Sequence, residues 1–297
     1  QVIAAYDQVL ADPAGPLFNR TLAGNLNPPG STFKLVVAAA ALDSGQYTAD
    51  SQFPNPPQLQ LPQSDSVIIN SGGDDCGGAP TVSISDAIRL SCNIPFAELG
   101  QAIGTRAILA QAMKFGFNSS VSVPLESTPS VYPRALDEPQ TMLSAFGQSS
   151  VRASPLQMAM VSMAIANGGT LMKPNLVESI TAPNLTVLQS LEPSVYGQAM
   201  SRETAAAITQ MMVGSVSNGA ASNARIDGVD VAGKTGTAEN GEGDPYTLWF
   251  TGFAPANDPQ VVVAVVVENG AGLGQSSYGN AIAAPIAKKV LEAVLFR

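Results

Sequence analysis

The sequence predicts a mixed α/β protein of the α+β kind, with helices in the middle of the chain and an antiparallel sheet near its end. The last third changes from helical patterns to runs with the two-residue period of strands. Short strands are expected at 229–238, 247–254 and 260–267, and turn residues separate them, which is the spacing of an antiparallel meander. An Ala-rich helix over 281–296 closes the chain. We therefore expect a central antiparallel sheet flanked by helices.

The earlier elements each have a local signal. Residues 1–6 are apolar and predict a short strand. The rigid turn at 27–30 (Asn-Pro-Pro-Gly) predicts the start of an apolar helix over 31–42, which ends before Gly45. Pro, Gly, Ser and Asp fill 53–80, which predicts loops with at most a short strand at 67–69. Apolar patterns bounded by helix caps predict the remaining helices at 83–90, 94–103, 105–115, 140–148, 155–167 and 202–217.

The composition restricts the classes of function. A chain of 297 residues with 45% hydrophobic content can bury a full core. Its net charge of -9 and its lack of any basic run disfavour nucleic acids and anionic membrane surfaces as partners. No apolar run is long enough to span a bilayer. Because the chain does not begin with Met, we expect it to be part of a longer protein that carries an anchor upstream.

The chain contains no histidine. This removes the commonest general base and every Ser-His-Asp or Cys-His arrangement. Two cysteines without histidine do not make a zinc site, so we expect neither a metal nor a cofactor. An acyltransferase or hydrolase with this composition must activate its nucleophile with lysine, a carboxylate or tyrosine.

A serine and a lysine stand one helical turn apart in the segment Ser31-Thr-Phe-Lys34. Their hydroxyl and amine therefore project from the same helix face. Lysine can deprotonate serine only within hydrogen-bond reach and with a pKa lowered by burial or by a nearby cation. The tetrapeptide alone also fits an ordinary helix start, with Ser31 as N-cap and Lys34 in solvent.

Two further patterns follow in order. Ser91-Cys-Asn93 lies at the joint between two predicted helices, where Ser and Asn are common. Lys234-Thr-Gly-Thr237 continues a predicted strand. Thr235 and Thr237 are expected on the face opposite Lys234, and Gly236 would let a ligand approach the backbone. The alternative interpretation is a glycine-marked bulge in an edge strand. The order SxxK, SxN, KTG on a helix start, a joint and a strand is the signature of β-lactamases and penicillin-binding proteins.

At these motifs the chain resembles the transpeptidase domain of class B penicillin-binding proteins. The resemblance extends over the segments 27–34, 90–100, 145–148, 155–158 and 232–239. It implies a β-lactamase/transpeptidase-like fold with an α/β part at 1–50 and 200–297 and a mainly helical part at 51–199. It also implies an amino-terminal anchor and a dimerisation module outside this sequence.

The resemblance implies a role for each motif residue. Ser31 would be the acylated nucleophile, Lys34 its general base and Ser91 the proton shuttle to the leaving group. Asn93 would bind the substrate amide and orient Lys34. The KTG segment, through Lys234, Thr235 and Thr237, would hold the substrate carboxylate.

Physical arguments support these roles. The backbone N–H groups of Ser31, at a helix N-terminus, and of Thr237, on a strand edge, are natural oxyanion-hole donors. The charge of Lys234 near Lys34 would lower the pKa of Lys34.

The function implied is that of a peptidoglycan D,D-transpeptidase. It would transfer the acyl group of a D-Ala-D-Ala stem peptide to the amine of a neighbouring stem peptide and would be inhibited by β-lactam antibiotics. It would work with the cell-wall synthesis machinery of cell division or cell shape, anchored at the extracytoplasmic face of the bacterial membrane. Three alternatives stay open: a D,D-carboxypeptidase that uses water as acceptor, a class A β-lactamase, and a β-lactam sensor that is acylated without catalysis.

The two cysteines, Cys76 and Cys92, leave two interpretations. Cys92 lies inside the second motif, and the extracytoplasmic location that the resemblance implies would permit a disulfide with Cys76. Two free buried thiols are the alternative. A bond would brace the joint that carries Ser91.

Overall fold

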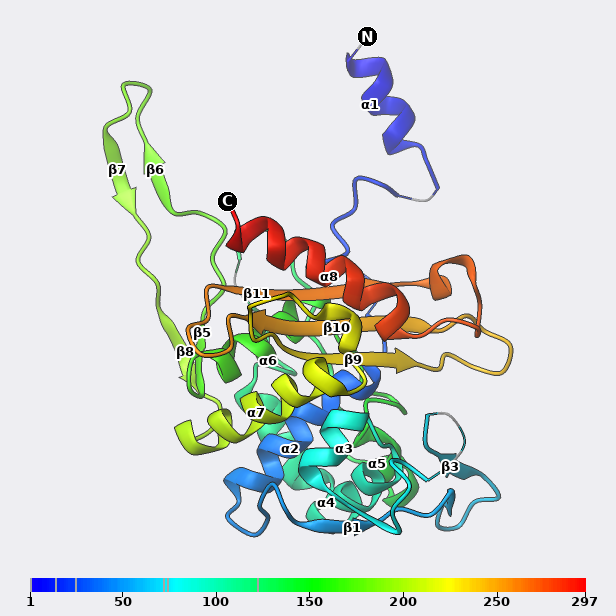
Figure 1. The fold of residues 1–297 in the computed structure, drawn as a ribbon. Helices are drawn as coiled ribbons and strands as arrows, with labels where there is room; N and C mark the ends of the chain where they lie inside the picture. Colours follow the sequence, from blue (N-terminus) through cyan, green and yellow to red (C-terminus); the bar gives the residue numbers. More distant parts are fainter. Residues whose placement is uncertain (1, 14, 25, 72, 74, 122) are drawn as a thin grey trace.

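Three antiparallel strands form the main sheet, in the order β11-β10-β9 (Figure 1). They are β9 (Ala232–Ala238), β10 (Thr247–Ala254) and β11 (Val261–Val267), in a computed structural model that describes residues 2–297 except 14, 25, 72, 74 and 122. Each strand pairs with the next along the chain. The predicted meander is therefore confirmed.

Helices cover both faces of this sheet. Every residue of β10 is buried, as expected of a central strand whose alternate side chains point into two layers. Phe250 packs in a cluster with α8 (Gly279–Leu295), whereas Trp249 belongs to the larger core on the other side. On that side α6 (Pro155–Ala166) contacts β10 and β11.

The helices below the sheet in Figure 1 surround α2, which is buried along nearly its whole length. The longest of them breaks at Gly104, whose φ of 77° and ψ of 158° are not helical, so the two helices predicted at 94–103 and 105–115 are joined across a kink. The helices of this region are η1 (Gly30–Phe33), α2 (Lys34–Asp43), α3 (Ile84–Leu90), α4 (Ile94–Lys114) and α5 (Glu138–Ser144). A further helix, α7 (Arg202–Asn218), packs against β9.

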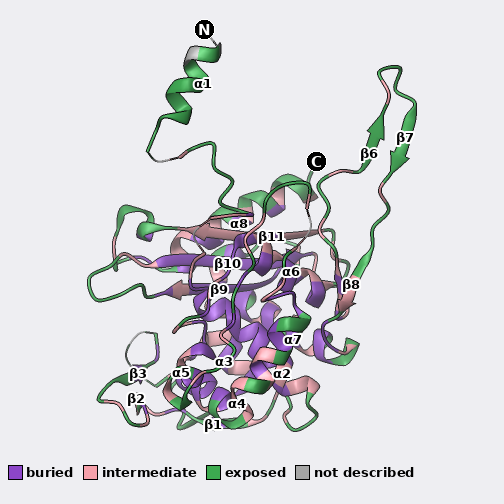
Figure 2. Cartoon of the chain, turned by 180° about the vertical axis from the view of Figure 1, so that it is seen from behind, coloured by how far each residue is buried: buried purple, intermediate pink, exposed green. Residues whose placement is uncertain are grey.

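Short two-stranded pairs complete the fold, and of these the sequence predicted only the strand at 67–69. The β6–β7 hairpin projects from the body, and both of its strands are exposed (Figures 1 and 2). The pairs are β1 (Gln52–Pro54) with β4 (Thr81–Ser83), β2 (Gln58–Gln60) with β3 (Val67–Ile69), β5 (Thr170–Met172) with β8 (Val195–Gln198), and β6 (Ser179–Thr181) with β7 (Val187–Ser190). Two 3₁₀ turns, η2 (Ser222–Ala224) and η3 (Asn269–Gly272), lie between the last helices and strands.

The prediction of a strand at 1–6 is wrong. Residue 1 lies outside the described residues, and the rest of the stretch belongs to a helix, α1 (Val2–Leu10), that projects away from the body (Figure 1). Ala and Leu in this segment favour a helix, and the part of the chain that the structure describes places no strand beside it to pair with.

The division into an α/β part at 1–50 and 200–297 and a helical part at 51–199 stays a prediction. One helix of the predicted helical part, α6, packs on the sheet. Among the described residues, no helix is both long and apolar enough to cross a bilayer.

Candidate active site

The turn before Ser31 is fixed against the sheet. The only tryptophan of the chain, Trp249 on β10, donates its indole N–H to the carbonyl oxygen of Pro28 at 2.9 Å. Gly30 has a φ of +53°, and a Cβ at this position would lie 3.0 Å from the carbonyl oxygen of Thr237. The first turn, η1, can therefore approach β9 closely, and this approach holds Ser31, which is 9% exposed, beside the strand.

Lys34 is completely buried beneath Ser31. Its Nζ donates to the main-chain oxygen of Ser91 at 2.8 Å and to Oδ1 of Asn93 at 2.9 Å, and it lies 5.7 Å from the centre of the Phe96 ring. Burial, and then the charge of Lys234, hold the pKa of Lys34 well below its usual range. This environment favours the neutral amine that a general base requires.

Ser91 connects the two lysines. Its main-chain oxygen accepts from Lys34, and its Oγ accepts from Nζ of Lys234 at 2.7 Å. Ser91 closes α3 in the left-handed region, with φ 67° and ψ 36°, a conformation that costs a residue other than glycine about 1 kcal/mol. Such a backbone outlier within a charged cluster is typical of a functional site.

Lys234 is also completely buried, and burial lowers its pKa to about 7. The alternation predicted for this strand is seen in its polar contacts. Lys234 turns to Ser91, whereas the hydroxyl of Thr235 donates to the Ala220 carbonyl at 3.0 Å and that of Thr237 accepts from a main-chain N–H of α8 at 3.0 Å. All three motifs thus meet at one place.

Gly236 has a structural role that the sequence did not predict. A Cβ at this position would lie 2.8 Å from the carbonyl oxygen of Pro29. The missing side chain therefore serves the packing of η1 on β9. Approach of a ligand to the same backbone stays a prediction, as do the oxyanion-hole roles of the Ser31 and Thr237 N–H groups.

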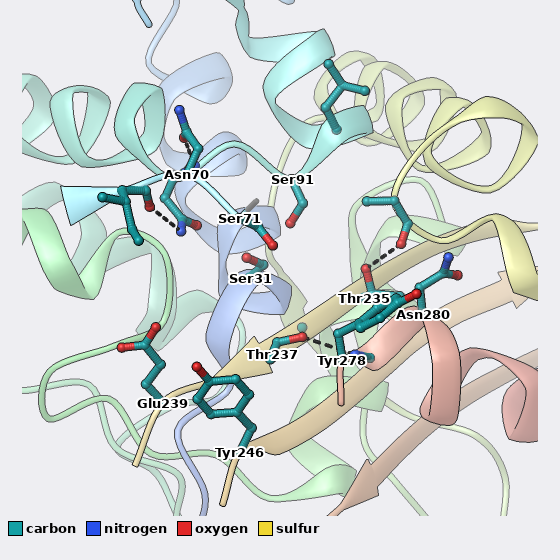
Figure 3. A pocket seen from close by; sticks show the side chains of 16 residues that line it. Ser31, Asn70, Ser71, Ser91, Thr235, Thr237, Glu239, Tyr246, Tyr278 and Asn280 are labelled. Atoms are coloured by element: carbon teal, nitrogen blue, oxygen red, sulfur yellow. Dashed lines mark hydrogen bonds between the residues drawn. The ribbon is translucent and has the colours of Figure 1, made fainter. Parts of the chain in front are cut away.

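A cavity of about 390 Å³ opens above these residues (Figure 3). Ser31, Ser91 and Thr237 lie around the same opening in this view. Both buried lysines donate to Ser91, which lines it. A second hollow of about 320 Å³ shares Ser31 and Thr237 and is bordered by apolar side chains, including Ile69 and Phe146. The site can therefore hold an extended ligand on both sides of the serine.

Several residues of the cavity were not predicted as site residues. Glu239 and Tyr246 lie at one end of the cavity, and Tyr278 and Asn280 lie near Thr235 (Figure 3). Burial and the charge of Glu239 raise the pKa of Tyr246. Only Glu239 had a signal in the sequence, because it closes the segment 232–239.

Cys76 and Cys92 form a disulfide with their Cα atoms 5.7 Å apart. Of the two interpretations that the sequence left open, the structure therefore has the disulfide and not two free thiols. The bond attaches the joint that carries Ser91 and Asn93 to the loop before β4. Within the described part of the chain, no group of three or more His, Cys, Asp or Glu side chains is arranged to hold a metal ion.

Known proteins match this chain over nearly its whole length. Residues 2–292 match the family model of the penicillin binding protein transpeptidase domain. The peptidoglycan D,D-transpeptidase PbpA of Mycolicibacterium smegmatis is 40% identical over 295 residues, which cover 98% of this chain and 59% of that protein. Stage V sporulation protein D of Bacillus subtilis is 31% identical over 298 residues, which cover 96% of this chain and 44% of that protein.

A solved structure agrees with these sequence matches. Penicillin-binding protein A of M. tuberculosis, as a ceftriaxone acyl-enzyme complex, superposes with a TM-score of 0.93 and 38% identity, covering 99% of this chain and 66% of that chain. The chain thus spans about three fifths of the length of its PbpA relatives. With its three motifs gathered around Ser31 on this fold, the chain belongs to the penicillin-binding protein transpeptidase family.

Proposed function

We propose that this chain is a serine D,D-transpeptidase that cross-links peptidoglycan stem peptides. One observation carries the proposal: two completely buried lysines with lowered pKa values converge on Ser91 beside Ser31. This arrangement supplies a neutral base and a hydroxyl relay without histidine.

The reaction has two acyl-transfer steps. Lys34 takes the Ser31 proton as Oγ attacks the carbonyl carbon of the penultimate D-Ala, and the N–H groups of Ser31 and Thr237 stabilise the resulting oxyanion. Ser91 passes a proton to the amide nitrogen as the C–N bond breaks, and D-Ala leaves. The amine of a second stem peptide then attacks the ester, which forms the new amide and returns the proton to Ser31.

The remaining polar groups hold the donor peptide. Lys234, Thr235 and Thr237 bind its terminal carboxylate, and Asn93 binds the amide of the peptide while it orients Lys34. A β-lactam, whose carboxylate and cyclic amide resemble the donor, acylates Ser31 by the same first step. The relatives' structures with ceftriaxone, imipenem and penicillin G as acyl-enzymes support this part of the proposal.

Intact mass spectrometry after incubation with penicillin tests the central claim. The wild type should gain one covalent adduct, and Ser31→Ala should gain none. A wild type that gains no adduct would contradict acyl transfer at Ser31.

The acceptor needs a separate experiment. With a D-Ala-D-Ala peptide or thioester donor and a D-amino acid in solution, a transpeptidase forms the exchanged product, whereas a carboxypeptidase forms only the hydrolysed one. No turnover of either kind, together with stable acylation, would indicate a β-lactam sensor. Rapid hydrolysis of nitrocefin would indicate a β-lactamase.

The place of action is a proposal of the same kind. We propose that the full-length protein acts at the extracytoplasmic face of the cell membrane, held by an amino-terminal anchor, together with the cell-wall synthesis machinery. Fractionation of cells that express the complete gene tests this. Recovery of the protein in the cytosol would contradict it.

A further inference from the structure

The N-terminus of α4 is capped by a side chain from another part of the chain. Asn93 is the N-cap residue of α4, but its side chain makes no capping hydrogen bond. Asn70, on the loop after β3, takes this role: its Oδ1 accepts from the N–H of Asn93 at 2.8 Å and from that of Ile94 at 3.1 Å. The first N–H groups of a helix need such an acceptor because no helical carbonyl reaches them.

This cap leaves the Asn93 side chain available for the active site. An N-cap asparagine ordinarily turns its own oxygen back onto the first turn of its helix. With Asn70 in that place, Asn93 Oδ1 accepts from Nζ of Lys34 at 2.9 Å, while Nδ2 donates to the carbonyl oxygen of Ile69 at 3.0 Å. Two adjacent residues, 69 and 70, therefore fix both the main chain and the side chain of Asn93.

The side chain of Asn70 is itself held by a hydrogen bond to Asn55. It is 1% exposed, and its Nδ2 donates to Oδ1 of Asn55, which is also 1% exposed, at 3.3 Å. Asn55 in turn bonds the N–H and carbonyl of Cys76, at 3.2 and 2.8 Å. A continuous series of hydrogen bonds thus runs from Cys76 through Asn55, Asn70 and Asn93 to Lys34. Figure 3 shows Asn70 on the side of Ser31 away from Thr237.

We propose that Asn70 is a positioning residue for acylation. By capping α4 it keeps Asn93, and through Asn93 the amine of Lys34, in the geometry needed to take the Ser31 proton. Asn70 neither exchanges a proton nor contacts the reacting atoms in this role. The inference rests on the proposed acyl transfer at Ser31.

The test measures the limiting rate of penicillin acylation and the penicillin concentration that gives half this rate. Asn70→Leu removes the acceptor at similar volume, and we expect the limiting rate to fall about 10- to 100-fold. The half-saturating concentration should change less than about threefold, because Lys234, Thr235 and Thr237, which hold the carboxylate, are untouched.

Two controls separate positioning from loss of stability. Ser201→Ala removes the N-cap of α7, where Ser201 Oγ accepts from the Thr204 N–H at 3.1 Å. It should lower the melting temperature by about 2–4 °C and leave the acylation rate unchanged. In an Asn93→Ala background, Asn70→Leu should slow acylation less than about threefold further, since the residue through which it acts is gone.

Several outcomes would overturn the inference. These are a wild-type rate in Asn70→Leu, an undiminished effect of that change in the Asn93→Ala background, or a half-saturating concentration that changes as much as the limiting rate. If leucine prevents folding, Asn70→Ala replaces it and the comparison in the Asn93→Ala background still decides. A wild type that is not acylated at all would instead contradict the proposed function.

Discussion

The disulfide next to Ser91 allows a quantitative prediction. Cys76 and Cys92 are separated by 16 positions, and Cys92 is completely buried. Closing a loop of this length restricts the unfolded chain by about 3 kcal/mol in the chain-entropy treatment. We therefore expect the double variant Cys76→Ala/Cys92→Ala to lose about 3 kcal/mol of unfolding free energy and roughly 6 °C in melting temperature.

Urea unfolding with and without dithiothreitol measures this contribution. The reductant should lower the urea midpoint of the wild type and leave that of the double variant unchanged, which separates the bond from the two sulfur atoms. Thiol titration of the denatured, unreduced wild type should find no free group. Two free thiols per chain, or equal midpoints for oxidised wild type and double variant, would refute the reasoning.

Three further predictions concern the site. The second-order rate of penicillin acylation should rise with pH as Lys34, whose pKa is lowered, becomes neutral, and should fall above about pH 7 as Lys234 loses its proton. A stopped-flow profile that keeps rising to alkaline pH would contradict this. Gly30→Ala should destabilise the protein by about 1 kcal/mol more than Gly45→Ala in urea unfolding, because both positions have positive φ but, of the two, only Gly30 has close neighbours for a Cβ. Equal losses of unfolding free energy would mean that the contact does not matter. Glu239→Gln should accelerate acylation by anionic penicillin about two- to fivefold at low ionic strength, since it removes a like charge from the cavity, and rates measured across a salt series should converge; a difference that persists at high salt would exclude this electrostatic cause.

The parts of the site that the sequence predicted are those in which chemistry follows from local spacing. Ser31 and Lys34 are one turn apart, and the alternation along Lys234–Thr237 follows from the period of a strand. Each of the three motifs is weak alone, but they occur in the order SxxK, SxN, KTG. The absence of histidine left few other ways to activate a serine, which strengthened the combined prediction. The meander was predictable for the same reason, since period and turn residues are local.

The supporting contacts were not predictable because they join distant segments. Asn55 and Asn70 lie in two loops of a stretch without periodicity, and asparagine in such loops ordinarily indicates only a turn. The role of Asn70 depends on contact with Asn93, the N-cap of α4, which is 23 positions away in the sequence. The strand expected at 1–6 failed for a related reason, because a short apolar run takes its conformation from neighbours that the sequence does not name.

The burial that prepares the two lysines also weakens the fold around them. The pKa of Lys234 falls from 10.5 to about 7 on folding, so between these values the unfolded chain binds the proton more readily than the folded one. The free energy of unfolding therefore declines as pH drops through this interval, and by pH 7 the loss from Lys234 is on the order of 5 kcal/mol. The lowered pKa of Lys34 acts in the same direction.

Local opening at the Ser91 joint would relieve this cost, because water would then reach both amines. It would also return the pKa of Lys34 toward its usual range and so favour the protonated amine. Two constraints hold this joint: the disulfide at Cys92, and the Asn70 cap on the first turn of α4. We infer that these constraints preserve reactivity as well as stability, since burial favours the neutral form of Lys34 only while the joint stays closed.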